Sequence, residues 1–485
     1  MSVTEAGSRD DASLLLRRAL LPQRGLFDLR IVGGRIVALQ RQLEPCAGER
    51  IIDARGSVLL PGLHDHHLHL FATAAARASL PCGPPAAHDE QSLRQALARH
   101  CAQGEGWVRG IGFHESACAQ LDRHWLDAVC AERPVRIQHR SGMLWVLNSC
   151  ALGHLRVAPD ECLPAGAERT ADGELTGRFF DLDAWLGSRL PRAWPSLRDV
   201  SAELARHGIT AVTDAGARNG QAAWEALCGA SARGELVQRV LVMGNEELAV
   251  SAGASPGRIE VGPLKIYLRE IGLPEFEALV LRVQAAHAQG RAVAFHCVTR
   301  VELTFALAAL AQAGTLPGDR MEHAAIADEH ALQALAALGV TVVTQPQFIA
   351  ERGDQYLRDV EAEDIPLLYR GAGFLRGGVA LAAGSDAPYG STDPWAAMRA
   401  AIGRRTRAGV QMNAGECLAP AQAIALFAGD LHRPASGLRE LAVGQPADLC
   451  LLDVSWEDLC ADPDARHVAL TVCAGRIVYA APRHA

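Results

Sequence analysis

The stretch PLKIYLREIGLPEFEALVLRVQAAHAQGRAVAFHC at residues 263–297 decides how this chain folds. It opens with the apolar run PLKIYL and closes with AVAFHC, and both runs have the length of buried strands. Between them, Phe276, Leu279, Val280 and Val283 recur at helical spacing, so one helix face is apolar. A strand, a helix and a second strand in this order predict two parallel strands joined by a crossover helix.

The same alternation of short apolar runs and helical segments continues on both sides of this stretch. The further strands that we predict are ITAVTDA (209–215), RVLVM (239–243), RMEHA (320–324), VTVVTQ (340–345) and VALAAGSD (379–386). SVLLPGL at 57–63 brings the number of strands to eight. Eight strands alternating with helices predict an α/β fold, a (β/α)8 barrel of the TIM type, which we place at residues 58–439.

Two further regions fall outside the barrel pattern. VGGRIVAL at 32–39 and CAGRIVYA at 473–480 read as nearly the same hairpin, so we expect a small β-sandwich formed from both termini, residues 1–57 and 440–485. Residues 71–200 do not fit one strand–helix repeat and predict an insertion after the first barrel strand. Because it follows the carboxyl end of a strand, we expect this insertion to help build the substrate pocket.

The composition excludes several classes of protein. Hydrophobic residues make up 49% and charged residues 21% of the 485, which is typical of a globular chain. The net charge of −8 argues against a nucleic-acid or membrane-surface partner. The polar, acidic start does not resemble a signal peptide, and no run of apolar residues is long enough to span a membrane. We therefore expect a cytoplasmic protein with a small-molecule substrate, and homo-oligomerisation stays open.

The densest group of histidines, LHDHHLH at 63–69, follows an apolar run. His67 and His69 are two apart in an extended segment, so their side chains point the same way and can bind one metal. A polar loop with surplus histidines is the alternative. His64 and His66 have the opposite parity, and we expect them to pack or to support the ligands.

Three more ionisable residues, His296, His323 and Asp386, lie at the carboxyl ends of predicted strands, where catalytic groups of a barrel converge. Each alone is more often a hydrogen-bonded core residue. Lys265 lies inside an apolar strand, where an unpaired ammonium is costly. Either it pairs with a carboxylate such as that of Glu270, or its amine is neutral and chemically modified.

The opening PGLHDHHLH resembles the metal-binding motif of the amidohydrolase superfamily, and the spaced Lys, His, His and Asp follow in that superfamily's order. The chain is most similar to amidohydrolase family 3, the YtcJ-like proteins, which include N-substituted formamide deformylases. GITAVTDAG, RMEHA, GSDAPYGSTDPW and GQPADLCLLD extend the resemblance over nearly the whole chain.

This resemblance implies a site with two divalent metals, usually zinc. The implied ligands are His67 and His69 with Asp386 for the first metal, His296 and His323 for the second, and a carboxylated Lys265 as the bridge. A metal-bound hydroxide would attack a carbonyl, and Asp386 would act as general base and then as general acid at the leaving nitrogen. The implied reaction is hydrolysis of a C–N bond in an amide or cyclic amide.

Two other functions stay open: a heterocycle deaminase on the same fold, and a binding protein on a barrel that has lost catalysis. Deaminases of this superfamily lack the bridging lysine, so Lys265 favours the hydrolase. The chain has Arg269 and Glu270 where YtcJ-like proteins commonly have Asp-Gly, which argues against the formamide substrate. The candidate substrate-binding residues are Trp145, Arg300, Arg352, Tyr356 and Tyr389.

Overall fold

The computed structural model describes residues 13–158, 161–190, 194–248 and 258–482. The chain divides into two compact units. The first comprises Met1–Thr73 and Ser196–Ala485, and the second is Ala74–Pro195. Each unit is described separately below.

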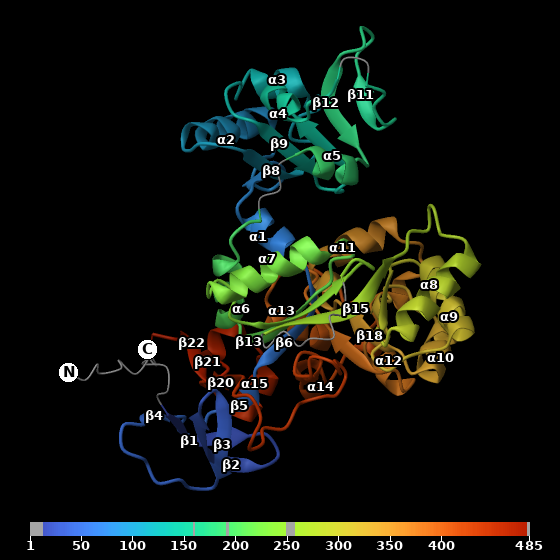
Figure 1. The fold of residues 1–485 in the computed structure, drawn as a ribbon. Helices are drawn as coiled ribbons and strands as arrows, with labels where there is room; N and C mark the ends of the chain where they lie inside the picture. Colours follow the sequence, from blue (N-terminus) through green and yellow to red (C-terminus); the bar gives the residue numbers. More distant parts are fainter. Residues whose placement is uncertain (1–12, 159–160, 191–193, 249–257, 483–485) are drawn as a thin grey trace, which may run out of the picture. The chain divides into compact units, whose positions relative to one another are not determined.

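An eight-stranded parallel sheet forms the centre of the first unit, in the order β19-β18-β17-β16-β15-β14-β13-β6 (Figure 1). Its strands are β6 (Leu63–Leu68), β13 (Ile209–Asp214), β14 (Arg239–Gly244), β15 (Ile259–Tyr267), β16 (Val293–Cys297), β17 (Arg320–His323), β18 (Thr341–Thr344) and β19 (Leu381–Ala383). Beyond β19, the N–H of Asp386 donates to the carbonyl of His67 at 2.6 Å, and His69 donates to Ala387 at 2.8 Å. These bonds join the first strand to the last, and the predicted TIM-type barrel is confirmed.

Helices follow most of the barrel strands. They are α1 (Leu70–Arg77), α6 (Arg198–Arg206), α7 (Gln221–Ala232), α8 (Phe276–Ala288), α9 (Arg300–Ala313), α10 (Glu329–Leu338), α11 (Gln347–Asp359), α12 (Ala372–Arg376), α13 (Pro394–Gly403) and α14 (Pro420–Ala425). A capping box between Thr299 and Glu302 starts α9. In α8, Leu279, Val280 and Val283 are buried, so the apolar spacing in the sequence marks the face that packs on the barrel.

The first barrel strand begins later than we predicted. Leu59–Pro61 forms β5, which pairs antiparallel with β20 (Leu449–Leu452) in another sheet, and the barrel strand starts at Leu63. Gly62 makes this change of sheet possible, because a Cβ there would lie 2.2 Å from Oγ1 of Thr210. The apolar run SVLLPGL thus serves two sheets, which periodicity alone does not distinguish.

The two chain ends supply two four-stranded sheets. One has the order β3-β2-β1-β4 and contains β1 (Leu14–Leu21), β2 (Gly25–Val32), β3 (Arg35–Gln40) and β4 (Arg50–Asp53). The other has the order β22-β21-β20-β5, with β21 (Val468–Cys473) and β22 (Arg476–Ala480), and α15 (Trp456–Ala461) follows β20. Leu16 and Leu29 of the first sheet share one hydrophobic cluster with Leu449 and Leu470 of the second. The two sheets therefore have a common core.

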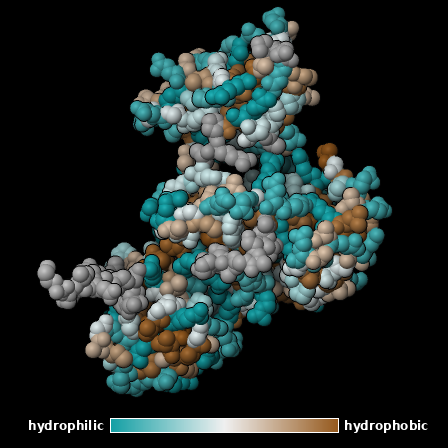
Figure 2. All heavy atoms as spheres, viewed as in Figure 1, coloured by the Kyte–Doolittle hydropathy of each residue, from teal (hydrophilic) through white to brown (hydrophobic). Residues whose placement is uncertain are grey.

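The N-terminal sheet is apolar on its outer surface as well. Leu26, Val37 and Ile51 are 44–47% exposed, and hydrophobic residues gather over this part of the surface in Figure 2. None of the helices in the described ranges combines the length and the apolar character needed to cross a membrane. The cytoplasmic location stays a prediction.

The second unit has its own sheet, in the order β11-β12-β10-β9-β8-β7. Its elements are β7 (Leu80–Pro81), α2 (Glu90–Ala102), β8 (Val108–Phe113), α3 (Arg123–Asp127), β9 (Val135–His139), β10 (Leu144–Leu147), α4 (Ser149–His154), β11 (Ala167–Arg169), β12 (Leu175–Phe180) and α5 (Asp183–Arg189). Along β10, Leu144 and Val146 belong to one hydrophobic cluster, and Trp145 and Leu147 belong to another. Successive residues of a strand face opposite sides, so both faces of this sheet are packed.

Candidate metal centre

The predicted ligands lie at the carboxyl ends of barrel strands. His67 lies in β6 and His69 directly follows it, while His296 lies in β16 and His323 ends β17. Asp386 comes three residues after β19. These strands all run parallel in one closed sheet, so their carboxyl ends lie at one rim of the barrel, where barrel enzymes place their catalytic groups.

His67, His69 and Asp386 form one compact group. Each offers a ligand atom, and the three atoms lie within 4.8 Å of one another. Oδ1 of Asp386 is 3.4 Å from Nε2 of His67 and 3.2 Å from Nε2 of His69. Burial alone would raise the pKa of Asp386, but hydrogen bonds from both imidazoles hold it well below its usual range. Two imidazoles and an ionised carboxylate are a donor set that suits zinc.

Asp65 fixes the backbone on which this group is built. Its Oδ1 accepts hydrogen bonds from the N–H of Ser385 at 2.9 Å and from that of His67 at 3.1 Å. The carboxylate thereby holds the end of β6 against the segment that carries Asp386. Burial raises the pKa of Asp65 to about 6.

His296 and His323 form a second group. Nε2 of His323 lies 2.9 Å from Nδ1 of His296, and Nδ1 of His323 donates to Oε1 of Gln345 at 2.7 Å. That bond leaves the Nε2 lone pair of His323 facing His296. The ring centroids of His67 and His323 are 4.8 Å apart, so the two groups adjoin. Burial lowers the pKa of His323 to about 3, which keeps its imidazole neutral and able to bind metal.

Lys265 lies two residues before the carboxyl end of β15 and is 3% exposed. Within the described residues its Nζ makes no hydrogen bond, and the carboxylate of Glu322 is 4.0 Å away. Glu322 therefore takes the place of Glu270, the partner that we considered from the sequence. Burial lowers the pKa of the Lys265 amine to about 8. A buried amine without a hydrogen bond beside two groups of ligands fits a residue that gains a further group.

Three residues near the centre were missed by the sequence analysis. Glu322 and Gln345 hydrogen-bond ligand histidines, and the ring of Tyr267 lies 4.2 Å from that of His296. Glu322 gave a signal, because it is a charged residue two positions from Arg320 within a predicted strand. Tyr267 shares the parity of Lys265 in β15, and this too places it on the ligand side.

The candidate substrate-binding residues of the first unit differ in their surroundings. Arg300 forms ion pairs with Asp364 and Asp328, at 3.3 Å to the latter, so its guanidinium is occupied by protein carboxylates. Tyr356 stacks on Tyr369 with ring centroids 6.0 Å apart. These contacts account for both side chains without a substrate, and a role of either residue in substrate binding stays a prediction.

Tyr389 and Arg352 are closer to the ligands. The ring of Tyr389 is 59% exposed and lies edge-on to that of His69, with centroids 6.0 Å apart. The guanidinium of Arg352 donates to the carbonyl of Tyr389 and lies 4.0 Å from the ring centroid of Phe348. Arg352 therefore supports the Tyr389 segment beside the centre.

Trp145 belongs to the second unit and lies in its core. Its side chain is 8% exposed, and its indole N–H donates to the carboxylate of Asp183 at 3.0 Å. The guanidiniums of Arg109 and Arg136 lie 5.5 Å and 5.6 Å from its ring. These contacts account for a tryptophan at this position, and we do not include it in the proposed pocket.

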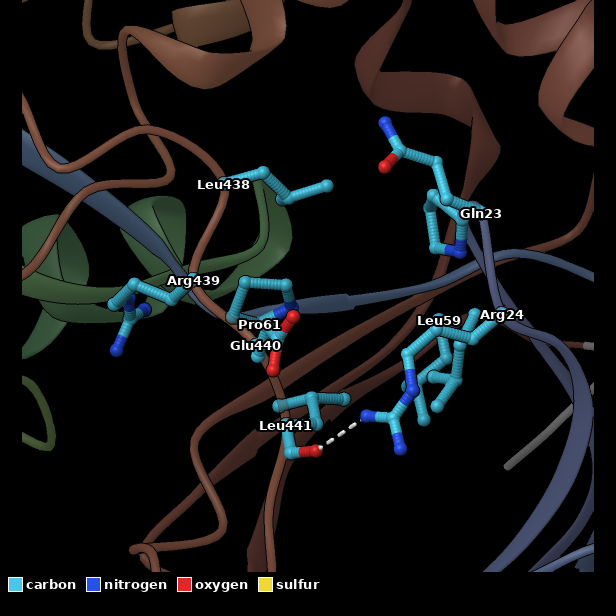
Figure 3. Close-up of a pocket in the computed structure, with 10 residues that line it drawn as sticks. Gln23, Arg24, Leu59, Pro61, Leu438, Arg439, Glu440 and Leu441 are labelled. Atoms are coloured by element: carbon cyan, nitrogen blue, oxygen red, sulfur yellow. Dashed lines mark hydrogen bonds between the residues drawn. The ribbon is translucent and has the colours of Figure 1, made fainter.

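A cavity of about 290 Å³ lies elsewhere in the first unit (Figure 3). Leu59 and Pro61 line it from the segment that precedes β6, and Arg24 donates a hydrogen bond across its edge to the carbonyl of Leu441 at 3.0 Å. Its lining contains none of the predicted metal ligands. The cavity adjoins the amino end of β6, whereas the ligands lie at the carboxyl end.

Comparison with known proteins gives the same assignment as the geometry. The amidohydrolase family matches residues 50–479, which is most of the chain. The chain belongs to the amidohydrolase family. This confirms the predicted class of enzyme, a metal-dependent hydrolase that acts on carbon–nitrogen bonds other than peptide bonds.

The sequence relatives of this amidohydrolase are distant but extend over its length. YtcJ of Bacillus subtilis (strain 168), which is named as an amidohydrolase, is 25% identical over 88% of this chain and 90% of its own. The N-substituted formamide deformylase of Arthrobacter pascens is also 25% identical, over 90% of this chain and 92% of its own. Both belong to the group that the sequence resembles.

Solved structures share the fold. An uncharacterised metal-dependent hydrolase from Pyrococcus horikoshii OT3 superposes with a TM-score of 0.78, covering 92% of this chain and 98% of its own, at 20% identity. Another from Pyrococcus furiosus gives a TM-score of 0.73 at 20% identity, covering 92% of this chain and 99% of its own. At 92% coverage, the superposition also extends to most of the chain outside the barrel.

Proposed function

We propose that this amidohydrolase cleaves the C–N bond of an amide or cyclic amide, using a centre of two divalent metals, with zinc as the expected metal. The observation that carries the proposal is the group formed by His67, His69 and Asp386, whose ligand atoms lie within 4.8 Å of one another. It lies at the rim of a parallel barrel, where such chemistry is usually found. These three residues would hold the first metal.

His296 and His323 would hold the second metal. The facing ring nitrogens support this assignment, since Nε2 of His323 and Nδ1 of His296 are 2.9 Å apart. Together with the first group they make five conventional ligands, more than the four that one tetrahedral zinc takes. Two metals divide these ligands better than one.

Lys265 would bridge the two metals after carboxylation. The ammonium first loses one proton; the neutral amine then attacks carbon dioxide, an N–C bond forms, and a second proton is released, so a buried cation becomes an anion. The support for this step is the buried Nζ, which has no hydrogen-bond partner in the described part of the chain. An anionic bridge between two metal cations also removes the like-charge repulsion that an ammonium would suffer.

Bound divalent metals supply the activation of a water molecule and the polarisation of the scissile carbonyl. The protein moves the proton. Asp386 takes a proton from the attacking water and delivers it to the leaving nitrogen, as base and then as acid. Its carboxylate is ionised at neutral pH, which is the form that a general base needs. The products are a carboxylate and an amine.

The test combines metal analysis with a hydrolysis screen of the purified protein. We expect about two divalent metals per chain, and release of acid and amine in equal amounts from some N-acyl, N-formyl or cyclic amide compounds. One metal per chain, unchanged in His296→Ala, would instead indicate a mononuclear centre. A protein that binds no metal would refute the proposal.

The same screen separates the two alternatives that the sequence left open. A heterocycle deaminase would release ammonia and leave the ring carbon skeleton intact. A binding protein on this barrel would retain compounds without converting them, even with both metals bound. Stoichiometric release of acid and amine is expected of the hydrolase alone.

A further inference from the structure

Glu322 lies between Arg320 and His323 in β17, and its side chain is fully buried. Its Oε1 accepts a hydrogen bond from Nε of Arg320 at 2.6 Å, and its Oε2 accepts one from Nη2 of Arg320 at 3.2 Å. Oε2 also accepts a hydrogen bond from Nδ1 of His67. The carboxylate of Glu322 in β17 thus contacts both an arginine of its own strand and a proposed metal ligand in β6. An ion pair that only stabilises the core would not need the second contact.

The same oxygen faces Lys265. Nζ of Lys265 is 4.0 Å from Oε2 of Glu322. The sheet register explains the approach, because Lys265 pairs with Ala294 on β16, and Ala294 pairs with Arg320 on β17. Glu322 is two residues beyond Arg320, on the same face of its strand and nearer the rim.

We propose that Glu322 is the shared hydrogen-bond acceptor that positions both His67 and the carboxylated Lys265. This inference rests on the proposed function. A carboxylated lysine keeps one N–H and gains two oxygens that share one negative charge. The carboxylate of Glu322 attracts the N–H and repels the oxygens, so it turns the new group away from itself and toward the ligands on the opposite side.

For His67 the consequence concerns the ring nitrogens. A carboxylate has no hydrogen to donate, so Nδ1 of His67 must carry a proton, and Nε2 is the ring nitrogen that gives up its own hydrogen when His67 binds a metal. That Nε2 is the atom that faces Asp386 at 3.4 Å. Outer hydrogen bonds of this kind orient metal ligands, and their loss typically lowers metal affinity by about 10–100-fold.

Arg320 keeps Glu322 in this role. It holds both carboxylate oxygens and also donates from Nη2 to the carbonyl of His66 at 2.7 Å, so the carboxylate cannot turn. Glu322 is therefore a positioning residue, acting through two ligands rather than on the substrate.

The test compares the wild type with Glu322→Gln and a matched control, Glu416→Gln. Glu416 is another buried glutamate paired with an arginine, Arg370 at 2.8 Å, and it contacts none of the proposed ligands. Metal affinity is measured by competition with a chelator. Carboxylation is measured by the carbonyl 13C resonance after equilibration with 13C-labelled bicarbonate.

We expect Glu322→Gln to lose about 10–100-fold in metal affinity and most of the labelled carbonyl signal, because the amide N–H₂ can turn toward either partner. Glu416→Gln is expected to keep both. The double variant Arg320→Met with Glu322→Gln also removes the buried cation, and it replaces the single variant in the test if Glu322→Gln folds poorly. It is likewise expected to bind metal weakly.

Two outcomes have different meanings. The role of Glu322 is overturned if the wild type shows the carbonyl signal and either Glu322→Gln or the double variant keeps the same signal and the same metal affinity. The proposed hydrolase function would be unaffected by that result. A wild type without metal or without the signal would overturn the carboxylated two-metal centre itself, and this inference with it.

Discussion

Asp386→Asn removes a proton carrier while keeping the shape of the side chain. Oδ1 of Asp386 lies 3.2 Å and 3.4 Å from the Nε2 atoms of His69 and His67, and an amide oxygen can occupy the same place. The amide cannot accept the proton of the attacking water or return it to nitrogen. We therefore expect the fold to persist and turnover to collapse.

The size of the effect follows from the proton-transfer role. General acid–base groups contribute about 10²–10⁴-fold to the rate, and each factor of ten is about 1.4 kcal/mol of barrier. The loss in kcat should therefore be at least 100-fold, or about 3 kcal/mol, even where metal is saturating. The measurement is release of amine at saturating substrate, with the metal content of the same sample determined by elemental analysis.

Asp393→Asn is the matched control for this measurement. Asp393 lies in the same segment after β19 and caps α13 by accepting from the N–H of Trp395 at 2.9 Å. An asparagine caps a helix about as well, so kcat and metal content should not change. Asp386→Asn with normal metal content and a kcat within about threefold of wild type would remove Asp386 from proton transfer.

Three further predictions concern the bridge, the packing and the pH dependence. Lys265→Ala should lose metal and activity together, and a short-chain carboxylic acid should partly restore activity by occupying the vacated bridge; a variant with full metal content contradicts the bridge. Gly384→Ala should lower both thermal stability and metal content, because its Cβ would lie 2.4 Å from the backbone nitrogen of His67; unchanged metal content would refute this. The hydrogen bond from His432, opposed by burial and aided by Arg239, lowers the pKa of Glu260 to about 2. The stabilisation is complete above the ordinary pKa of 4.5 and is lost as the pH falls through the folded-state pKa of about 2, so the thermal midpoints of wild type and Glu260→Gln should converge over that interval.

The barrel and the positions of the candidate ligands along the chain could be predicted from the sequence, because both depend on local patterns. Apolar runs alternating with helical faces predicted the strands, and His296 and His323 could be placed at strand ends by counting from those runs. The first strand was misplaced, since SVLLPGL is apolar throughout and gives no sign that Gly62 separates two sheets. Periodicity reports burial and does not report which sheet buries a segment.

Side-chain contacts between residues that lie far apart in the sequence could not be predicted from local patterns. The ion pair of Arg300 joins it to Asp364, which lies 64 residues away in the chain, and no local pattern in the sequence predicts this pair. Glu322 similarly acquires its contact with His67 across 255 residues. A single sequence shows that a charged residue lies in a predicted strand, but the register of several strands decides which groups that charge contacts.

The backbone of the centre shows that the fold itself arranges the ligands. His323 has a φ of 68° and Asp386 a φ of 52°, in the left-handed region that residues with side chains rarely adopt. Such conformations cost about 1–3 kcal/mol each and persist where surrounding structure imposes them. Here the hydrogen bond from Asp386 to the carbonyl of His67, and the bond from Ala324 to that of Glu322, hold the chain as it leaves β19 and β17. The strands thus end by turning two ligands toward His67 and His69, and the stability of the barrel sustains a geometry that the isolated segments would not adopt.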